Sequence, residues 1–161
     1  MDQATNMSRV AMRVKFLDPE PYGHAGEEFA PATSGSAGID LRACIKEAEV
    51  VIEPGDRLAV PSGVAIEVMV PGVAGFVYSR SGLGAKDGVT VSQGVGVIDP
   101  DYRGEIKVFL TNTSKEPKTV TRGQRIAQLI LQPFFRAEVE AVDELGGTDR
   151  GAGGFGHTGR M

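Results

Sequence analysis

Residues 39–46 read IDLRACIK, and every second side chain in this stretch is apolar. Successive side chains of a β-strand point to opposite faces, so this pattern predicts a strand with one buried and one polar face. Cys44 would then share the polar face with Asp40 and Arg42. The stretch therefore favours a half-buried strand in a β fold.

The rest of the chain repeats this pattern in short runs. The alternation recurs in residues 10–16 and 105–110, and shorter β-rich runs predict strands at residues 50–52, 58–60, 64–70, 75–78, 89–91, 118–121, 126–131 and 138–142. Turn-forming pairs such as Pro54-Gly55, Pro71-Gly72 and Asp87-Gly88 separate the runs. Apart from one short helical turn expected at residues 81–86, we find no helical stripe. The predicted fold class is all-β, a sandwich or barrel.

Length, cysteine count and charge limit the classes of protein that fit. A chain of 161 residues supports one domain, or a domain with an arm. Cys44 is the single cysteine, which excludes an internal disulfide and favours a reducing, cytoplasmic compartment. A net charge of −4 argues against a general nucleic-acid-binding surface, and no apolar run is long enough for a membrane span. A polyanionic ligand would need a few well-placed cations.

The last 16 residues differ in character from the rest. They read GGTDRGAGGFGHTGRM and hold 7 of the 22 glycines but one aromatic residue, Phe155. Such a segment cannot form a core of its own. We therefore predict a β domain over residues 1–145 and a flexible arm over residues 146–161.

Several common catalytic sites are improbable in this sequence. The two histidines, His24 and His157, lie in a predicted loop and in the tail, which argues against a Ser-His-Asp triad or a histidine-based zinc site. The tail contains G-x-G-x-x-G from Gly151 to Gly156, but no helix can follow it as dinucleotide binding requires.

Four polar clusters and the arm remain as candidate functional segments. They are AGIDLRA (37–43), SRSGLG (79–84), GVIDPDYRGEI (96–106) and RGQRIAQL (122–129). Each has an ordinary explanation as a strand face, a turn or a hairpin connection. Each also has a functional one: the glycines of SRSGLG would let backbone N–H groups and a guanidinium converge on an anion, and an aspartate of the third cluster could act as a general base.

Taken in order with RGAGGFGHTGR (150–160), these segments resemble the five ordered motifs of the homotrimeric dUTP diphosphatases. The resemblance covers residues 37–160. It implies a distorted jelly-roll-like β domain, a homotrimer with shared active sites, and a C-terminal arm that closes over a site. It further implies hydrolysis of dUTP to dUMP and pyrophosphate, which limits uracil incorporation into DNA and supplies dUMP for thymidylate synthesis.

The resemblance also implies roles in catalysis and phosphate binding. Asp99 matches the general base that activates the attacking water, and Asp40 matches the acid that holds Mg²⁺ through water ligands. The remaining residues match contacts to the phosphate chain, with Arg150 at the terminal phosphate: Arg80, Ser81, Gly82, Gln128 and Arg150.

For the nucleoside, the resemblance points to the hairpin of residues 93–107. Its backbone groups would pair with the uracil edge, with Gln93, Val97, Ile98 and Lys107 in contact. Tyr102 matches the residue under the deoxyribose, where its ring would clash with a ribose 2′-hydroxyl. Phe155 matches the arm aromatic that stacks over the base, and Gly156 follows it. Two positions depart from the common family pattern, since Gln93 stands for Asn and His157 for Ser.

Two alternatives stay open at this point. A dCTP deaminase-like enzyme of the same superfamily would release ammonia from dCTP, although it lacks this five-motif set. A non-catalytic dUTP sensor would bind the nucleotide and signal to a partner, although a sensor has no need of a water-activating base.

Overall fold

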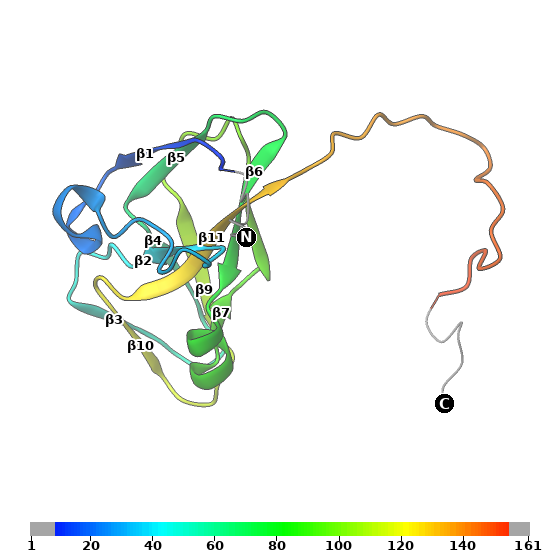
Figure 1. The fold of residues 1–161 in the computed structure, drawn as a ribbon. Helices are drawn as coiled ribbons and strands as arrows, with labels where there is room; N and C mark the ends of the chain where they lie inside the picture. The colour runs from blue at the N-terminus through cyan, green and yellow to red at the C-terminus, as the bar shows by residue number, and fades with distance from the viewer. Residues whose placement is uncertain (1–8, 155–161) are drawn as a thin grey trace, which may run out of the picture.

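A computed structural model describes residues 9–154 of the chain. Within this range eleven strands and three short helical segments follow one another (Figure 1). In chain order they are β1 (Met12–Phe16), η1 (Glu20–Tyr22), η2 (His24–Gly26), β2 (Ile39–Arg42), β3 (Glu49–Ile52), β4 (Arg57–Pro61), β5 (Val64–Val68), β6 (Val73–Ser79), η3 (Gly82–Lys86), β7 (Val89–Val91), β8 (Val95–Ile98), β9 (Lys107–Asn112), β10 (Lys118–Thr121) and β11 (Arg125–Pro133).

The strands pair antiparallel in separate sheets. A four-stranded sheet has the order β2-β11-β6-β8 and a three-stranded sheet the order β4-β9-β7, while β1 pairs with β5 and β3 with β10. Across the described residues the sheets do not close into a continuous barrel. The predicted all-β class is confirmed, as is the helical turn after β6, which forms η3. Within residues 9–154 no helix has the length and apolar composition needed to cross a membrane.

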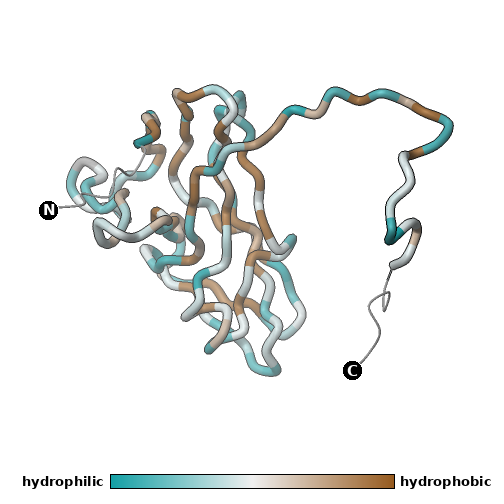
Figure 2. Tube along the Cα trace, turned by 45° about the vertical axis from the view of Figure 1, so that its right-hand side comes forward, coloured by the Kyte–Doolittle hydropathy of each residue, from teal (hydrophilic) through white to brown (hydrophobic). Residues whose placement is uncertain are grey.

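The core lies between the sheets and takes its side chains from alternate strand positions. In β9, Val108 and Leu110 are buried while Lys107 and Phe109 are exposed, as the alternation predicts. Leu41, Val77, Ile126 and Leu129 come from the four-stranded sheet to the same core. Figure 2 shows hydrophobic segments along the strands and hydrophilic ones in the connecting loops.

One predicted strand ends early, and the reason is a change of partner. The strand expected over residues 39–46 stops at Arg42, because the Ala43 N–H donates to the Gln124 C=O and the Cys44 N–H to the Pro61 C=O. Cys44 and Ile45 are therefore both buried, and the prediction that Cys44 lies on the polar strand face is wrong. Burial raises the pKa of the Cys44 thiol to about 12.

Two further differences concern strands. No strand forms at residues 138–142, because the chain leaves the sheets after Phe134, whose N–H donates to the Gly72 C=O, and residues 135–154 make no backbone hydrogen bond to a strand (Figure 1). Strand β8 was not among the predicted runs, since Gly96 interrupts its apolar pattern. A Cβ at Gly96 would lie 3.3 Å from Val77 Cβ, so the neighbouring strand leaves little room for a side chain. The division at residue 145 stays a prediction.

Candidate functional site

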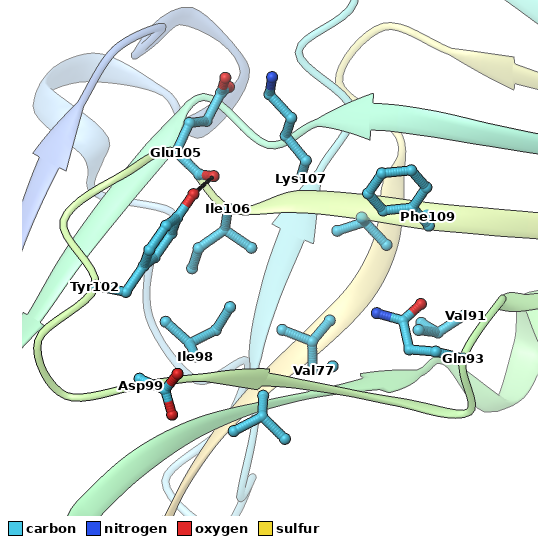
Figure 3. Close-up of a pocket in the computed structure, with 13 residues that line it drawn as sticks. Val77, Val91, Gln93, Ile98, Asp99, Tyr102, Glu105, Ile106, Lys107 and Phe109 are labelled. Atoms are coloured by element: carbon cyan, nitrogen blue, oxygen red, sulfur yellow. Dashed lines mark hydrogen bonds between the residues drawn. The ribbon is translucent and has the colours of Figure 1, made fainter.

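A cavity of about 350 Å³ opens where β8 and β9 separate (Figure 3). The two strands are consecutive, yet they belong to different sheets and do not pair with each other. The cavity is lined by Val77, Val91, Gln93, Gly96, Val97, Ile98, Asp99, Tyr102, Glu105, Ile106, Lys107, Val108 and Phe109. Its walls are thus mainly aliphatic, with a few polar groups at the rim.

Backbone groups on both sides of this cavity lack a strand partner. Strand β8 is the edge of its sheet and pairs with β6 on one side. Strand β9 pairs with β7 at residues 110–112, and the Phe109 C=O still accepts the Ser92 N–H at 2.8 Å, so the part of β9 before Phe109 is open on that side. A planar ligand with alternating donors and acceptors can satisfy such N–H and C=O groups. The site is therefore suited to bind a ligand edge with main-chain atoms.

The loop between β8 and β9 carries two polar side chains at the cavity mouth. Asp99 directly follows β8, and its C=O accepts the Tyr102 N–H at 3.0 Å. The Tyr102 hydroxyl donates to the Glu105 C=O at 3.0 Å, which fixes the ring across the loop. A Cβ at Gly104 would lie 2.4 Å from the Tyr102 hydroxyl oxygen, so the ring occupies the space that a side chain would need.

A second cluster lies where β2, β6 and β11 meet. Arg80 Nε lies 2.8 Å from Asp40 Oδ1, and Arg125 Nη1 lies 3.2 Å from Asp40 Oδ2. The carboxylate is largely covered, with 20% of its side chain exposed. Two guanidinium groups around one carboxylate leave a net positive charge, which favours an anionic ligand.

The same cluster borders a hollow of about 490 Å³. It is lined by Ala32, Ser36, Ala37, Gly38, Asp40, Arg80, Ser81, Gly82, Arg125 and Gln128. Gln128 lies opposite Asp40 in the β2–β11 register, and its Nε2 donates to the Ser79 C=O at 3.0 Å. A Cβ at Gly38 would come within 2.9 Å of Gln128 Oε1, so glycine there gives the amide its place.

The predicted site residues fall into three groups. Gln93, Val97, Ile98, Asp99, Tyr102 and Lys107 line the cavity, and Asp40, Arg80, Ser81, Gly82 and Gln128 line the hollow. Arg150 joins neither: its side chain bonds to the C=O groups of Gly153 and Gly154 in the exposed segment. Phe155 and Gly156 lie outside the described residues, as does His157. The geometry supports two binding regions, while the individual roles stay predictions.

Sequence reasoning missed Arg125 as a member of the hollow. Arg125 and Gln128 are three positions apart, so a regular strand would point them to opposite faces. A β-bulge between Arg125 and Ala127 adds one residue to β11 and brings both side chains to the Asp40 side. Phe109 and Glu105 were also missed as cavity residues. The second arginine of RGQR was the signal that could have identified Arg125.

Comparisons with known proteins agree with this geometry. The dUTPase family model matches residues 25–159. The deoxyuridine 5'-triphosphate nucleotidohydrolases of Ectopseudomonas mendocina and Escherichia coli are each 46% identical to this chain, covering 92% of it and 97% of their own length. The structure of a mutant dUTPase of Staphylococcus bacteriophage 80alpha with dUpNHpp has a TM-score of 0.78 at 22% identity, and covers 93% of this chain and 99% of its own. The Streptococcus mutans dUTPase has a TM-score of 0.64 at 25% identity, covering 78% and 98%. This chain belongs to the dUTPase family.

Proposed function

We propose that this protein hydrolyses dUTP to dUMP and pyrophosphate, by attack of water on the alpha phosphorus. One observation carries the proposal: a cavity edged by unpaired main-chain groups holds Asp99 at its mouth. The names of relatives at 46% identity support the same substrate.

Selection of the base and sugar follows from the cavity walls. The open edges of β8 and β9 offer N–H and C=O groups to the uracil edge. Pairing of uracil with these groups would leave no room for the methyl group of thymine. Cytosine presents a donor where uracil presents an acceptor, so its amino group meets the wrong partner. Val97, Ile98 and Lys107 contact the nucleoside, with Gln93 at the cavity rim. The Tyr102 ring lies under the deoxyribose and excludes a ribose 2′-hydroxyl.

Asp99 acts as the general base for the attacking water. It follows β8 directly and lies at the mouth of the cavity, which supports access to a water near the nucleotide's alpha phosphate. Arg80, Ser81, Gly82 and Gln128 bind the phosphate chain in the hollow, together with Arg125. The positive field of the two guanidinium groups stabilises the charge that develops on the phosphate oxygens.

Magnesium is the expected cofactor, and the donor groups fit one particular mode of binding. Residues 9–154 contain no group of three or more His, Cys, Asp or Glu side chains that could hold the ion alone. Asp40 is a single carboxylate that is already paired with Arg80 and Arg125, so it would hold the ion through water ligands and not directly. Bound there, Mg²⁺ would neutralise phosphate charge. One similar structure, of a mutant dUTPase from phage phi11 of S. aureus, reveals the coordination of a structural Mg(II) ion in that protein.

The active sites would be shared within a homotrimer. In one chain the cavity and the hollow are separate, and Arg150 lies in neither. The segment after β11 exposes large apolar side chains, with 99% of Phe135, 91% of Val139 and 89% of Leu145 accessible, which favours cover by another subunit. The arm would bring Arg150, Phe155 and Gly156 over a site on a neighbour. A cytoplasmic location and the absence of nucleic-acid and membrane partners complete the proposal.

The test is pyrophosphate release with Mg²⁺ from dUTP, dTTP, dCTP and UTP. Release from dUTP alone is the expected result. Ammonia release from dCTP would instead favour a deaminase of the same superfamily. Tight dUTP binding without turnover would favour a sensor, and either result would refute the proposed reaction.

A further inference from the structure

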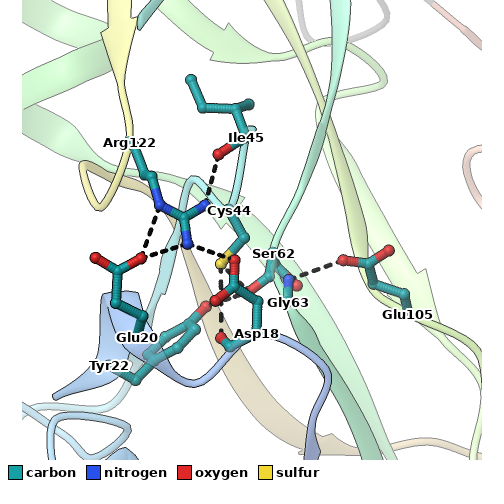
Figure 4. A network of polar contacts seen from close by, with 9 residues as sticks. All are labelled: Asp18, Glu20, Tyr22, Cys44, Ile45, Ser62, Gly63, Glu105 and Arg122. Atoms are coloured by element: carbon teal, nitrogen blue, oxygen red, sulfur yellow. Dashed lines mark hydrogen bonds and ion pairs between the residues drawn. The ribbon is translucent and has the colours of Figure 1, made fainter. Parts of the chain in front are cut away.

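Glu105 joins the cavity to the turn between β4 and β5. Its C=O accepts the Tyr102 hydroxyl at 3.0 Å, on the cavity side of the loop (Figure 3). Its carboxylate points the other way and accepts the N–H of Gly63 through Oε1 at 2.9 Å (Figure 4). The residue therefore bonds on one side to the ring that borders the sugar position and on the other to a buried turn.

The turn that Glu105 contacts, at Ser62 and Gly63, is held in place by close packing and by several hydrogen bonds. Gly63 is buried with φ +69°, and a Cβ there would lie 2.6 Å from Cys44 Sγ. Its C=O accepts the Leu17 N–H at 2.7 Å. The preceding C=O, of Ser62, accepts the Tyr22 hydroxyl at 2.7 Å and the Cys44 thiol at 3.1 Å (Figure 4). Burial raises the pKa of Tyr22, so its hydroxyl stays a donor.

One other side chain of the loop between β8 and β9 bonds to a residue far away in the sequence. Arg103 Nη2 lies 3.2 Å from Glu67 Oε1, but 52% of the arginine side chain is exposed. Exposed pairs of this kind hold a loop weakly. The Glu105 bond joins a half-buried carboxylate to a buried N–H, which makes it the stronger restraint.

We propose that Glu105 is a positioning residue for sugar selection, holding Tyr102 under the deoxyribose by anchoring the Asp99–Glu105 loop to Gly63. This inference rests on the proposed dUTP hydrolysis and on the place of Tyr102 in it. The carboxylate is directed away from the cavity centre, so it acts through Tyr102 and not on the substrate.

The test compares kcat/KM for dUTP and UTP in Glu105→Ala, Glu105→Gln and Glu105→Asp. Loss of one charge-assisted hydrogen bond predicts about a tenfold fall in the dUTP/UTP ratio for Glu105→Ala, with more change in KM than in kcat. Gln keeps an acceptor oxygen at the same reach and should restore most of the ratio. Asp keeps the charge but is one methylene too short, so its ratio should fall as in the alanine variant.

Glu67→Ala is the matched control, because it removes the exposed ion pair between Glu67 and Arg103 of the loop. It should leave the dUTP/UTP ratio within about twofold of the wild type. A ratio unchanged in both the alanine and the aspartate variants would overturn the proposal. Restoration by Asp but not by Gln would also overturn it, and would do so even if the alanine variant failed to fold. Wild-type protein without dUTP turnover would refute the proposed function itself, whereas an active wild type with an unchanged series refutes only the role of Glu105.

Discussion

Replacing Arg125 with Met removes one of the two guanidinium groups beside Asp40 while keeping most of the side chain's length. Two unit charges 4 Å apart attract by about 4 kcal/mol at an effective dielectric of 20. Arg125 is 48% exposed and shares its charge with Asp40, so about 1.4 kcal/mol of phosphate binding is a realistic loss. That corresponds to about a tenfold rise in KM for dUTP, with a smaller change in kcat.

The assay is pyrophosphate release over a range of dUTP concentrations, at low and at moderate salt. The rise in KM should shrink as salt increases, because screening weakens the lost attraction in the wild type. Arg57→Met is the control, since it removes one exposed positive charge at the start of β4, away from the hollow. A KM for Arg125→Met within twofold of the wild type, or equal to that of the control, would refute the phosphate role of Arg125.

Three further predictions concern catalysis, the arm and the buried thiol. Asp99→Asn should bind a non-hydrolysable dUTP analogue as the wild type does but lose most turnover, measured by calorimetry and pyrophosphate release; unchanged turnover would contradict the general-base role. A chain ending at Asp149 should keep its oligomeric state by light scattering and lose most activity, so a fully active truncate would exclude the arm from the reaction. Cys44, with its pKa raised from 9.0 to about 12, should react with iodoacetamide at pH 8 about a thousandfold more slowly folded than unfolded. Because the folded state disfavours the thiolate, this group's contribution to stability should decline as the pH rises from about 9 toward 12, and equal alkylation rates would show an accessible thiol.

Local pattern predicted much of this fold because most strands bury one face. Apart from β8 and the strand that ends at Arg42, the strands that form lie within two residues of the predicted runs at each end, and the period of β9 placed Val108 and Leu110 in the core. The pattern failed where a tertiary partner decides. Cys44 is buried because its N–H turns to Pro61, and neither that exchange nor the contact of Gly96 with Val77 is visible in hydrophobic periodicity.

The site was predictable to the level of residue groups but not of their arrangement. Motif matches placed Asp40 and Gln128 in one set, and the antiparallel register brings them opposite each other. Arg125 was not predicted as a site residue, because a single inserted residue in β11 reverses the face of the strand on which it lies. Glu105 was not predicted either, because its hydrogen-bond partner, the N–H of Gly63, lies 42 positions earlier in the chain.

The open edges of β8 and β9 have a consequence for how base preference can evolve. A pocket that reads its ligand through peptide groups carries the same donors and acceptors whichever side chains its strands bear. Val95, which is exposed and does not line the cavity, is therefore free to drift without altering the base that is accepted. A new preference would instead require a shift in strand spacing or register, a change that single substitutions seldom produce.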